Sequence, residues 1–164
     1  MPLAVQAEKE EVSYSAKRLK SSMVNGHPCK KLKGNVKVRF ASSGIVVTAN
    51  QAYRYDNQEL LEAYGKVKIT DKEGRTLQAD QVSYHVDQQL AVLTDHVACQ
   101  AEGYSFHTSK MKYNIAEKKG DFSGHGKLVQ GKMTLTSTAG VYDGHAEMVH
   151  FTGQVVLVLS LIHI

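Results

Sequence analysis

The sequence predicts an all-β protein built from one repeating unit of about 30 residues. Three observations predict it: two sets of markers that recur along the chain with the same period, and an alternation of apolar and polar residues within each unit. In the first marker, a glycine or polar corner precedes a short strand. Its apolar positions are Val36, Val67, Val97, Leu128 and Val155, which are spaced 31, 30, 31 and 27 residues apart.

A second marker lies in the middle of each unit. Aligning Ala52, Val82, Met111 and Val141 gives spacings of 30, 29 and 30 residues. Because the two markers keep the same period independently, we interpret the chain as a stack of similar units.

Within a unit, apolar and polar residues alternate, as in Val36, Val38 and Phe40. A period of two predicts half-buried strands, with one face inward and one face in water. Turn residues such as those of 42–44 and 71–74 separate the strands. Only 58–64 has room for a helical turn, and the equivalent 88–94 favours a strand. The prediction is a solenoid-like pair of facing antiparallel sheets with exposed strand edges and an apolar groove.

Length and composition fit one globular domain. The chain has 164 residues, of which 42% are hydrophobic and 22% are charged. The formal charge is +4, but the basic clusters at 17–20 and 30–33 lack the interleaved aromatic residues that single-strand binders use. We therefore expect no nucleic-acid partner.

The two cysteines, Cys29 and Cys99, are 70 residues apart with no CxxC spacing. This pattern does not fit a zinc site. Their number permits a disulfide, but Cys99 falls on an inward strand position, where a small apolar side chain suffices. The sequence alone leaves the pairing open.

The sequence contains no complete motif for catalysis or for binding a cofactor or a metal. His145 and His150 are five residues apart on a predicted strand, whereas a metalloprotease motif needs two histidines four apart on a helix. The segment 124–126 lacks the lysine and helix of a phosphate-binding loop, so we expect a turn there. Asp80, Asp87 and Asp95 suit turn and corner positions.

The two termini suggest processing or truncation. Residues 1–11 fit either the last part of a secretory signal peptide, with Val5 and Ala7 at its small-residue positions, or an irregular N-terminus. The C-terminal residues 159–164 resemble translated sequencing adapter. We therefore expect residues 12–157 to form the domain and 158–164 to be an apolar tail that is not native.

Four segments have a characteristic pattern: 79–84 followed by 90–97, together with 32–38 and the opening 12–17. These segments resemble the OstA-like family of lipopolysaccharide transport proteins, the family of LptA and LptC. The resemblance covers about residues 12–157. It fits a free-standing LptA-like protein, part of an LptC-like protein, or a fragment of a larger OstA-like protein.

The resemblance implies an open β-jellyroll in the periplasm whose apolar groove holds the acyl chains of lipopolysaccharide. It also implies a bridge between the inner and outer membranes, formed by edge-to-edge pairing with other OstA-like domains. The groove residues that we expect to contact lipid are Val36, Val38, Ile45, Val47, Val67, Ile69, Leu77, Val82, Tyr84, Val97, Phe106, Met111, Tyr113, Leu128, Leu135, Val141 and Val155.

Three hypotheses of function follow. The first is a non-enzymatic lipid conduit without cofactor, in which Lys37, Lys66, Lys68 or Lys112 meets lipid phosphates. The second is a scaffold that polymerises through its edges and carries no ligand. The third, a polysaccharide-cleaving enzyme, needs converging carboxylates in a cleft. An open apolar groove favours the conduit, and a closed core favours the scaffold.

Overall fold

The computed structural model describes residues 11–101 and 103–160. One three-residue 3₁₀ helix, η1 (Asp56–Gln58), lies among strands. The strands are, in chain order, β1 (Val12–Ser15), β2 (Arg18–Val24), β3 (His27–Phe40), β4 (Ile45–Tyr55), β5 (Leu60–Thr70), β6 (Thr76–His85), β7 (Leu90–Ala101), β8 (Tyr104–Asn114), β9 (Lys119–Gln130), β10 (Met133–Asp143), β11 (Met148–Thr152) and β12 (Val156–Leu159).

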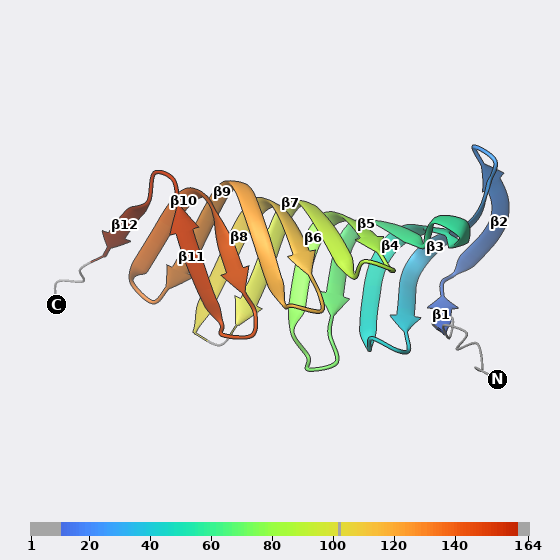
Figure 1. Cartoon of the computed structure of the whole chain (residues 1–164), viewed down its shortest axis with the longest axis horizontal. Coiled ribbons are helices and arrows are strands. Elements are labelled where there is room, and N and C mark those ends of the chain that lie inside the picture. The colour runs from blue at the N-terminus through green and yellow to red at the C-terminus, as the bar shows by residue number, and fades with distance from the viewer. Residues whose placement is uncertain (1–10, 102, 161–164) are drawn as a thin grey trace, which may run out of the picture.

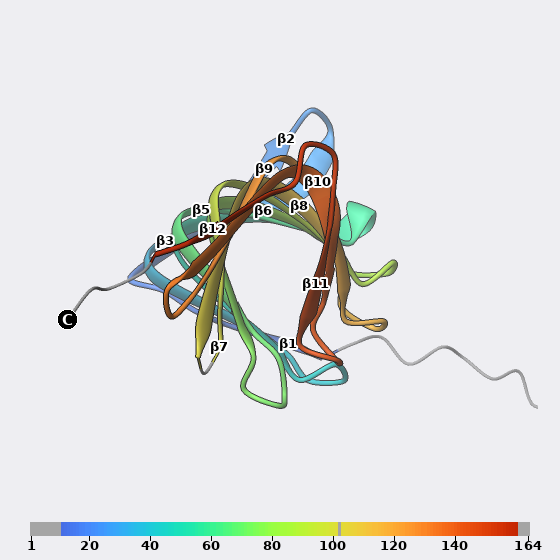
Figure 2. The same cartoon turned by 90° about the vertical axis from the view of Figure 1, so that its left-hand side faces the viewer.

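The strands form one antiparallel sheet in the order β1-β3-β4-β5-β6-β7-β8-β9-β10-β11, with β2 on β3 and β12 on β10. The molecule is elongated, with the strands crossing its long axis and the first and last strands at opposite ends (Figure 1). Viewed along that axis, the strands wrap around a common centre (Figure 2). The predicted all-β fold is confirmed, and its two facing sheets are two halves of one open, bent sheet.

A row of β-bulges bends the sheet. Where β4 pairs with β5, for example, the register shifts between Thr48 and Gln51 on one strand and between Lys68 and Tyr64 on the other. Gly65 and Lys66, at the bend, have φ of 81° and 47°. Such bulges bend strands and increase their twist. The first three corners of the first marker, at 34–35, 65–66 and 95–96, are therefore bends inside strands.

We call the row of bends the corner and the two halves of the sheet wall A and wall B. Wall A consists of residues 12–15, 36–49, 67–79, 97–101, 104–108, 126–137 and 156–159. Wall B consists of residues 18–24, 27–33, 51–64, 81–94, 110–123 and 139–152. The side opposite the corner, where the turns of the two walls face each other, is called the seam.

Each wall carries an inward-facing ladder of mostly apolar residues in direct register. The ladder of wall A runs through Tyr14, Val38, Val47, Ile69, Leu77, Cys99, Phe106, Leu128, Leu135 and Leu157. The ladder of wall B runs through Leu19, Leu32, Ala52, Ala63, Val82, Leu93, Met111, Phe122, Gly140 and Phe151. The period of two therefore produces a continuous apolar interior.

The two walls are staggered along the long axis. Phe40 on β3 of wall A meets Tyr84 on β6 of wall B, with ring centroids 5.0 Å apart. Farther along, Phe106 on β8 of wall A stacks on Tyr142 of β10 at 6.1 Å. A strand of wall A thus faces wall B two or three strands later in the sequence.

The structure tests two predictions of local secondary structure. Residues 58–64 form the end of η1 and the start of β5 rather than a helix, as their register with 88–94 predicted. The segment Gly124–Gly126, expected to be a turn, lies inside β9 at its bend, where Gly124 has a φ of 97°. The glycines were attributed to a turn because a bend within a strand needs the same backbone freedom.

Candidate functional site

The apolar interior between the walls is the candidate site. Of the 17 predicted groove residues, 14 are at most 8% exposed, from Val38 at 0% to Leu128 at 8%. Leu135 and Val141 are half-buried, and Val155 is 50% exposed. The burial of most of the set was thus predictable from the alternation of residues. Contact with lipid stays a prediction.

The repeat markers slip out of register in the fourth unit. Gly126, rather than Leu128, is cross-strand equivalent to Val97 through Thr108. Likewise Gly140, rather than Val141, continues the ladder of wall B, while Val141 pairs with Asp121 and His150 and faces outward.

The reason for this slip is the side chain of Phe122. A Cβ added at Gly126 would lie 2.3 Å from the Phe122 ring, and one added at Gly140 would lie 2.4 Å from that ring and 2.1 Å from the His150 carbonyl oxygen. The ring therefore occupies the space that an apolar side chain fills in the other units. A search for apolar markers passes over such glycines and selects the next apolar residue.

The interior is packed in this structure. The cavity described between the walls has a volume of about 20 Å³ and is lined by residues that include Ile45, Ile69, Tyr113 and Tyr142. Burial raises the pKa of the Tyr113 and Tyr142 hydroxyls. A larger hollow, of about 320 Å³, lies on the outer face of wall A between Lys68 and His107. Entry of a chain-like ligand into the interior therefore needs the walls to separate.

An ion-pair cluster joins the walls across the seam. Glu73, in the turn between β5 and β6, accepts a hydrogen bond of 2.6 Å from Lys118 Nζ, in the turn between β8 and β9. Arg75 Nη2 lies 3.2 Å from the other oxygen of the same carboxylate. The Lys118 ammonium holds the pKa of the Glu73 carboxyl below its usual range. Two cations thus converge on one carboxylate at the edge of the apolar interior.

A comparable cluster lies near the N-terminal end. Arg54, only 6% exposed, has its Nε 3.3 Å from the Tyr14 hydroxyl of β1 and 3.5 Å from an Asp56 oxygen. Lys30 donates to the other Asp56 oxygen. Here the two cations and the carboxylate all belong to wall B or its turn, and only the tyrosine belongs to wall A.

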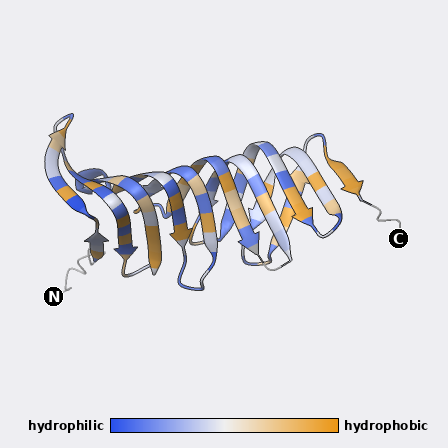
Figure 3. Cartoon of the chain, turned by 180° about the vertical axis from the view of Figure 1, so that it is seen from behind, coloured by the Kyte–Doolittle hydropathy of each residue, from blue (hydrophilic) through white to orange (hydrophobic). Residues whose placement is uncertain are grey.

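The ends of the interior are less covered than its centre because of the stagger. Leu157, in the ladder of wall A, is 55% exposed, and Leu19, in the ladder of wall B, is 54% exposed. The hydropathy colouring shows β12 as a hydrophobic strand at the C-terminal end (Figure 3). The C-terminal end thus presents an apolar half-strand, β12, and the N-terminal end presents Leu19 and Met23 on the mostly polar β2, with nothing in the described chain covering either set.

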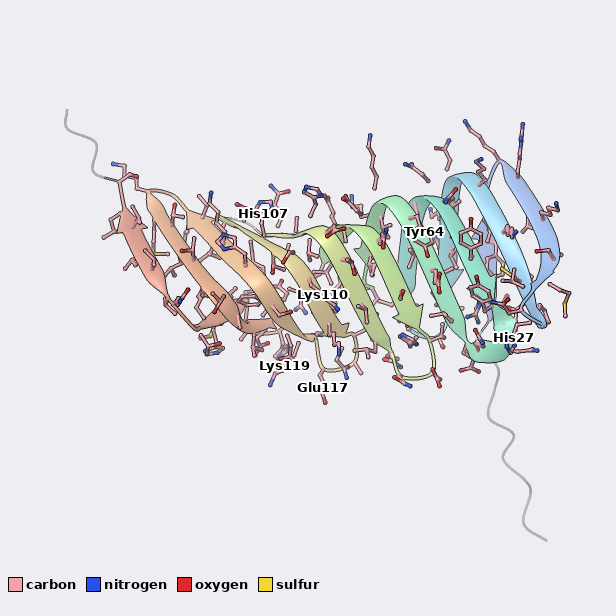
Figure 4. The ribbon with its side chains drawn as sticks, turned by 90° about the horizontal axis from the view of Figure 1, so that it is seen from above. His27, Tyr64, His107, Lys110, Glu117 and Lys119 are labelled. Atoms are coloured by element: carbon pink, nitrogen blue, oxygen red, sulfur yellow. The ribbon has the colours of Figure 1, made fainter. Side chains whose placement is uncertain are left out.

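The predicted basic contacts lie away from the seam. Lys37 and Lys68 lie on the outer face of wall A, Lys112 on that of wall B, and Lys66 at the corner. Figure 4 shows His107 and Lys110 on the two sides of the corner, with Glu117 and Lys119 near a seam turn. The sequence reasoning missed Glu73, Arg75 and Lys118. The available sequence signal was that Glu73 and Lys118 lie in charged turns 45 residues apart, which is one and a half repeats.

The residues considered for other chemistry do not gather into one site. Asp80 contacts His96 at 2.6 Å beside the corner, whereas Asp87 lies in a seam turn. His145 lies in a turn and His150 on β11. In the described part of the chain, no three His, Cys, Asp or Glu side chains are placed to hold a metal ion.

Both cysteines are buried and free. Burial raises the pKa of the Cys99 thiol, which occupies its predicted inward position in the ladder of wall A. Residues 11–101 and 103–160 contain no helix that is long and apolar enough to cross a membrane. The segment expected to be a leader lies almost entirely outside the described residues.

A bent, repeat-built sheet with a continuous apolar interior is the architecture that the resemblance implied. The family model for OstA-like proteins matches residues 11–163. The chain belongs to the OstA-like protein family. This confirms the resemblance, which had been assigned on segments between residues 12 and 97.

In a comparison with solved structures, this chain shows a distant similarity to LptH of Pseudomonas aeruginosa. LptH is the LptA-homologous periplasmic component of that organism's lipopolysaccharide transport device. The similarity has a TM-score of 0.38 and 12% sequence identity, and it covers 93% of this chain and 96% of LptH. A comparison with curated proteins gave no match.

Proposed function

We propose that this OstA-like protein binds lipopolysaccharide in the periplasm and carries it between the inner and outer membranes. The observation that carries the proposal is the pair of inward ladders, which make one apolar interior along the whole stack of strands. Family membership supports the class of ligand. Acyl chains lie between the walls, and the sugars emerge into water at the seam.

Binding requires the walls to part at the seam. Across the corner the walls are one continuous backbone, but in the described chain the contacts between seam turns of different walls are side-chain contacts such as Glu73 with Lys118. Exchanging side-chain packing for acyl packing is favourable because each buried CH₂ contributes about 0.8 kcal/mol relative to water. No covalent step or cofactor is needed, so the protein acts as a conduit and not as an enzyme.

The partners at the ends are other OstA-like domains. β1 and β2 form the two halves of the first bent strand, and β11 and β12 form the two halves of the last. Strand direction alternates through the sheet, so a second copy placed end to end continues the antiparallel pattern. Unpaired edge groups favour such strand addition. The uncovered Leu157 and Leu19 then lie against the adjoining domain.

Site-specific photo-crosslinking tests the proposal. A crosslinker at the buried positions Val82 or Phe106 is expected to capture lipopolysaccharide in cells, because both side chains point between the walls. The exposed positions Gln81 and Lys110 are the controls. Labelling confined to these outward positions would rule out an internal lipid path.

A scaffold without ligand is the second candidate, and the packed interior favours it. With a cavity of about 20 Å³, the structure has room for one water but not for an acyl chain. On this hypothesis, hydrogen exchange at buried positions such as Leu93 and Val97 stays equally slow with and without lipopolysaccharide. The conduit hypothesis expects exchange near the seam to change when lipid separates the walls.

A further inference from the structure

We infer that Arg75 and Lys118 form a headgroup site at the seam for a phosphate- or carboxylate-bearing amphiphile, and that Glu73 occupies this site in the absence of ligand. The inference rests on the proposed function, because it assumes that the chains of the amphiphile enter the interior. It adds a specific anion site to an otherwise apolar path.

The convergence of the two cations is the first argument. The Glu73 carboxylate lies 2.6 Å from Lys118 Nζ and 3.2 Å from Arg75 Nη2, so an anionic oxygen group already fits between them. Arginine and lysine are the side chains that bind phosphate and carboxylate oxygens most strongly. The resident carboxylate therefore marks the position of an external anion.

The second argument is that the Arg75 guanidinium has a hydrogen-bond donor that is not used. Arg75 Nη1 is buried and has no hydrogen-bond partner among the described residues. A buried donor without a partner is costly, and a ligand oxygen would satisfy it. Phosphate offers more acceptor oxygens than the side chain of Glu73, so it could engage both Nη atoms and Lys118 together.

Hydrogen bonds within and between neighbouring turns hold the turns that present the cations. Asp71 Oδ1 accepts 2.9 Å hydrogen bonds from the backbone N–H groups of Glu73 and Arg75. In the opposite turn, Asn114 Oδ1 accepts from the Glu117 N–H at 3.0 Å, and Lys118 O accepts from the Gly144 N–H at 2.7 Å. Preorganised donors lose little conformational entropy when they bind.

The apolar surroundings are the third argument, because they select an amphiphile over a free anion. Arg75 and Asp71 line the same small cavity as Ile45, Ile69 and Leu77. An anionic head held by the cations therefore places its hydrocarbon chain directly against the ladder of wall A. Each CH₂ that enters contributes about 0.8 kcal/mol.

Direct binding measurements test the site with the full chain and simple probes. Dodecyl phosphate and dodecanoate supply anionic heads of two kinds, dodecyl maltoside supplies a neutral head on the same chain, and inorganic phosphate supplies the head alone. Removing both cations in R75Q/K118Q is expected to weaken dodecyl phosphate binding by about tenfold or more. Binding of dodecyl maltoside should stay unchanged.

Two further variants guard against misfolding. E73Q removes the competing carboxylate, so it should bind dodecyl phosphate more tightly than the natural sequence, a gain that an unfolded protein cannot give. K30Q is the matched control, because Lys30 also pairs with a carboxylate shared with an arginine, but within one wall. Its affinity for every probe should be unchanged.

The outcomes separate the two proposals. If the natural chain binds neither anionic nor neutral amphiphile, the lipid-binding function itself fails. If it binds both, and R75Q/K118Q and E73Q leave dodecyl phosphate affinity unchanged, only the headgroup site fails. Binding of inorganic phosphate as tightly as dodecyl phosphate would also overturn the site as one for amphiphiles. A loss limited to one anionic probe would assign the source as phosphate or carboxylate.

Discussion

At the scale of single residues, the bends depend on residues that adopt left-handed backbone conformations. Gly65 and Lys66 both have positive φ, and Asn50 of the neighbouring strand packs against Gly65. Asp95 and His96 adopt the same conformation at another bend without glycine. A bend can therefore form without glycine, and the contact with Asn50 is specific to the bend at Gly65.

We expect Gly65→Ala to destabilise the fold for two reasons. Its φ of 81° disfavours a side chain, and the new Cβ would lie 2.6 Å from Asn50 Nδ2. The left-handed conformation alone costs about 1–2 kcal/mol. Gly74→Ala is the matched control, because its φ is 88° but nothing lies within 4 Å. Urea denaturation should show a larger loss for Gly65→Ala, and equal losses would contradict the contact with Asn50.

The pair of His96 and Asp80 predicts a pH effect at another bend. The Asp80 carboxylate raises the pKa of His96 above its ordinary value of 6.5. Because the folded-state pKa is raised, the pair stabilises the bend below pH 6.5, and this contribution is lost as pH rises through the folded-state pKa. NMR titration of His96 should show the raised pKa, and Asp80→Asn should lower it. An unchanged midpoint in that variant would exclude the pairing.

At the scale of elements, side-chain contacts between the walls add to the strand pairing within each wall. Phe106 of wall A contacts Phe122, Tyr142 and Phe151 of wall B. Aromatic pairs at such distances add to the free energy of burial. β8 therefore holds the walls together near the C-terminal half.

Phe106→Ala should destabilise the fold by about 3–5 kcal/mol, since it removes a fully buried ring and leaves a cavity. The neighbouring His107→Ala is the control, because His107 is exposed on the outer face of the same strand. Denaturant midpoints measure both changes. A loss for Phe106→Ala no larger than that for His107→Ala would mean that the walls do not pack through this ring.

The elements could be predicted from the sequence where the apolar pattern is regular. Val36, Val67 and Val97 located three bends because each follows a glycine or polar pair and begins a buried half-strand. The fourth unit was misaligned because Gly126 and Gly140 carry no side chain and Phe122 fills their space. The seam cluster was not predicted, because the stagger decides which turns of the two walls meet, and alternation within a strand carries no information on the stagger.

At the scale of the whole molecule, the stagger determines what the two ends present. Wall A extends beyond wall B at one end, where Leu157 is uncovered, and wall B extends beyond wall A at the other, where Leu19 is uncovered. In an end-to-end assembly each overhang lies opposite the other. The joint would then bury apolar side chains in addition to pairing strand edges.

Leu157→Lys is therefore expected to weaken self-association, because Leu157 faces inward across the proposed joint in register with Leu135. Val156→Lys is the control, since Val156 is in register with Thr136 and faces outward. Sedimentation velocity at several protein concentrations measures the difference. Equal association of the two variants would mean that the inward face of β12 is not part of the joint.

The alternation of direction between neighbouring bent strands also makes the length of the molecule adjustable in fixed steps. One repeat contributes two bent strands, so its insertion or removal changes the length by about 10 Å, twice the spacing between neighbouring strands. Both ends keep their direction, overhang and apolar face after such a change, because the strand that follows still runs antiparallel to its neighbour. Proteins of this design can therefore be fitted to gaps of different width without redesign of their joints.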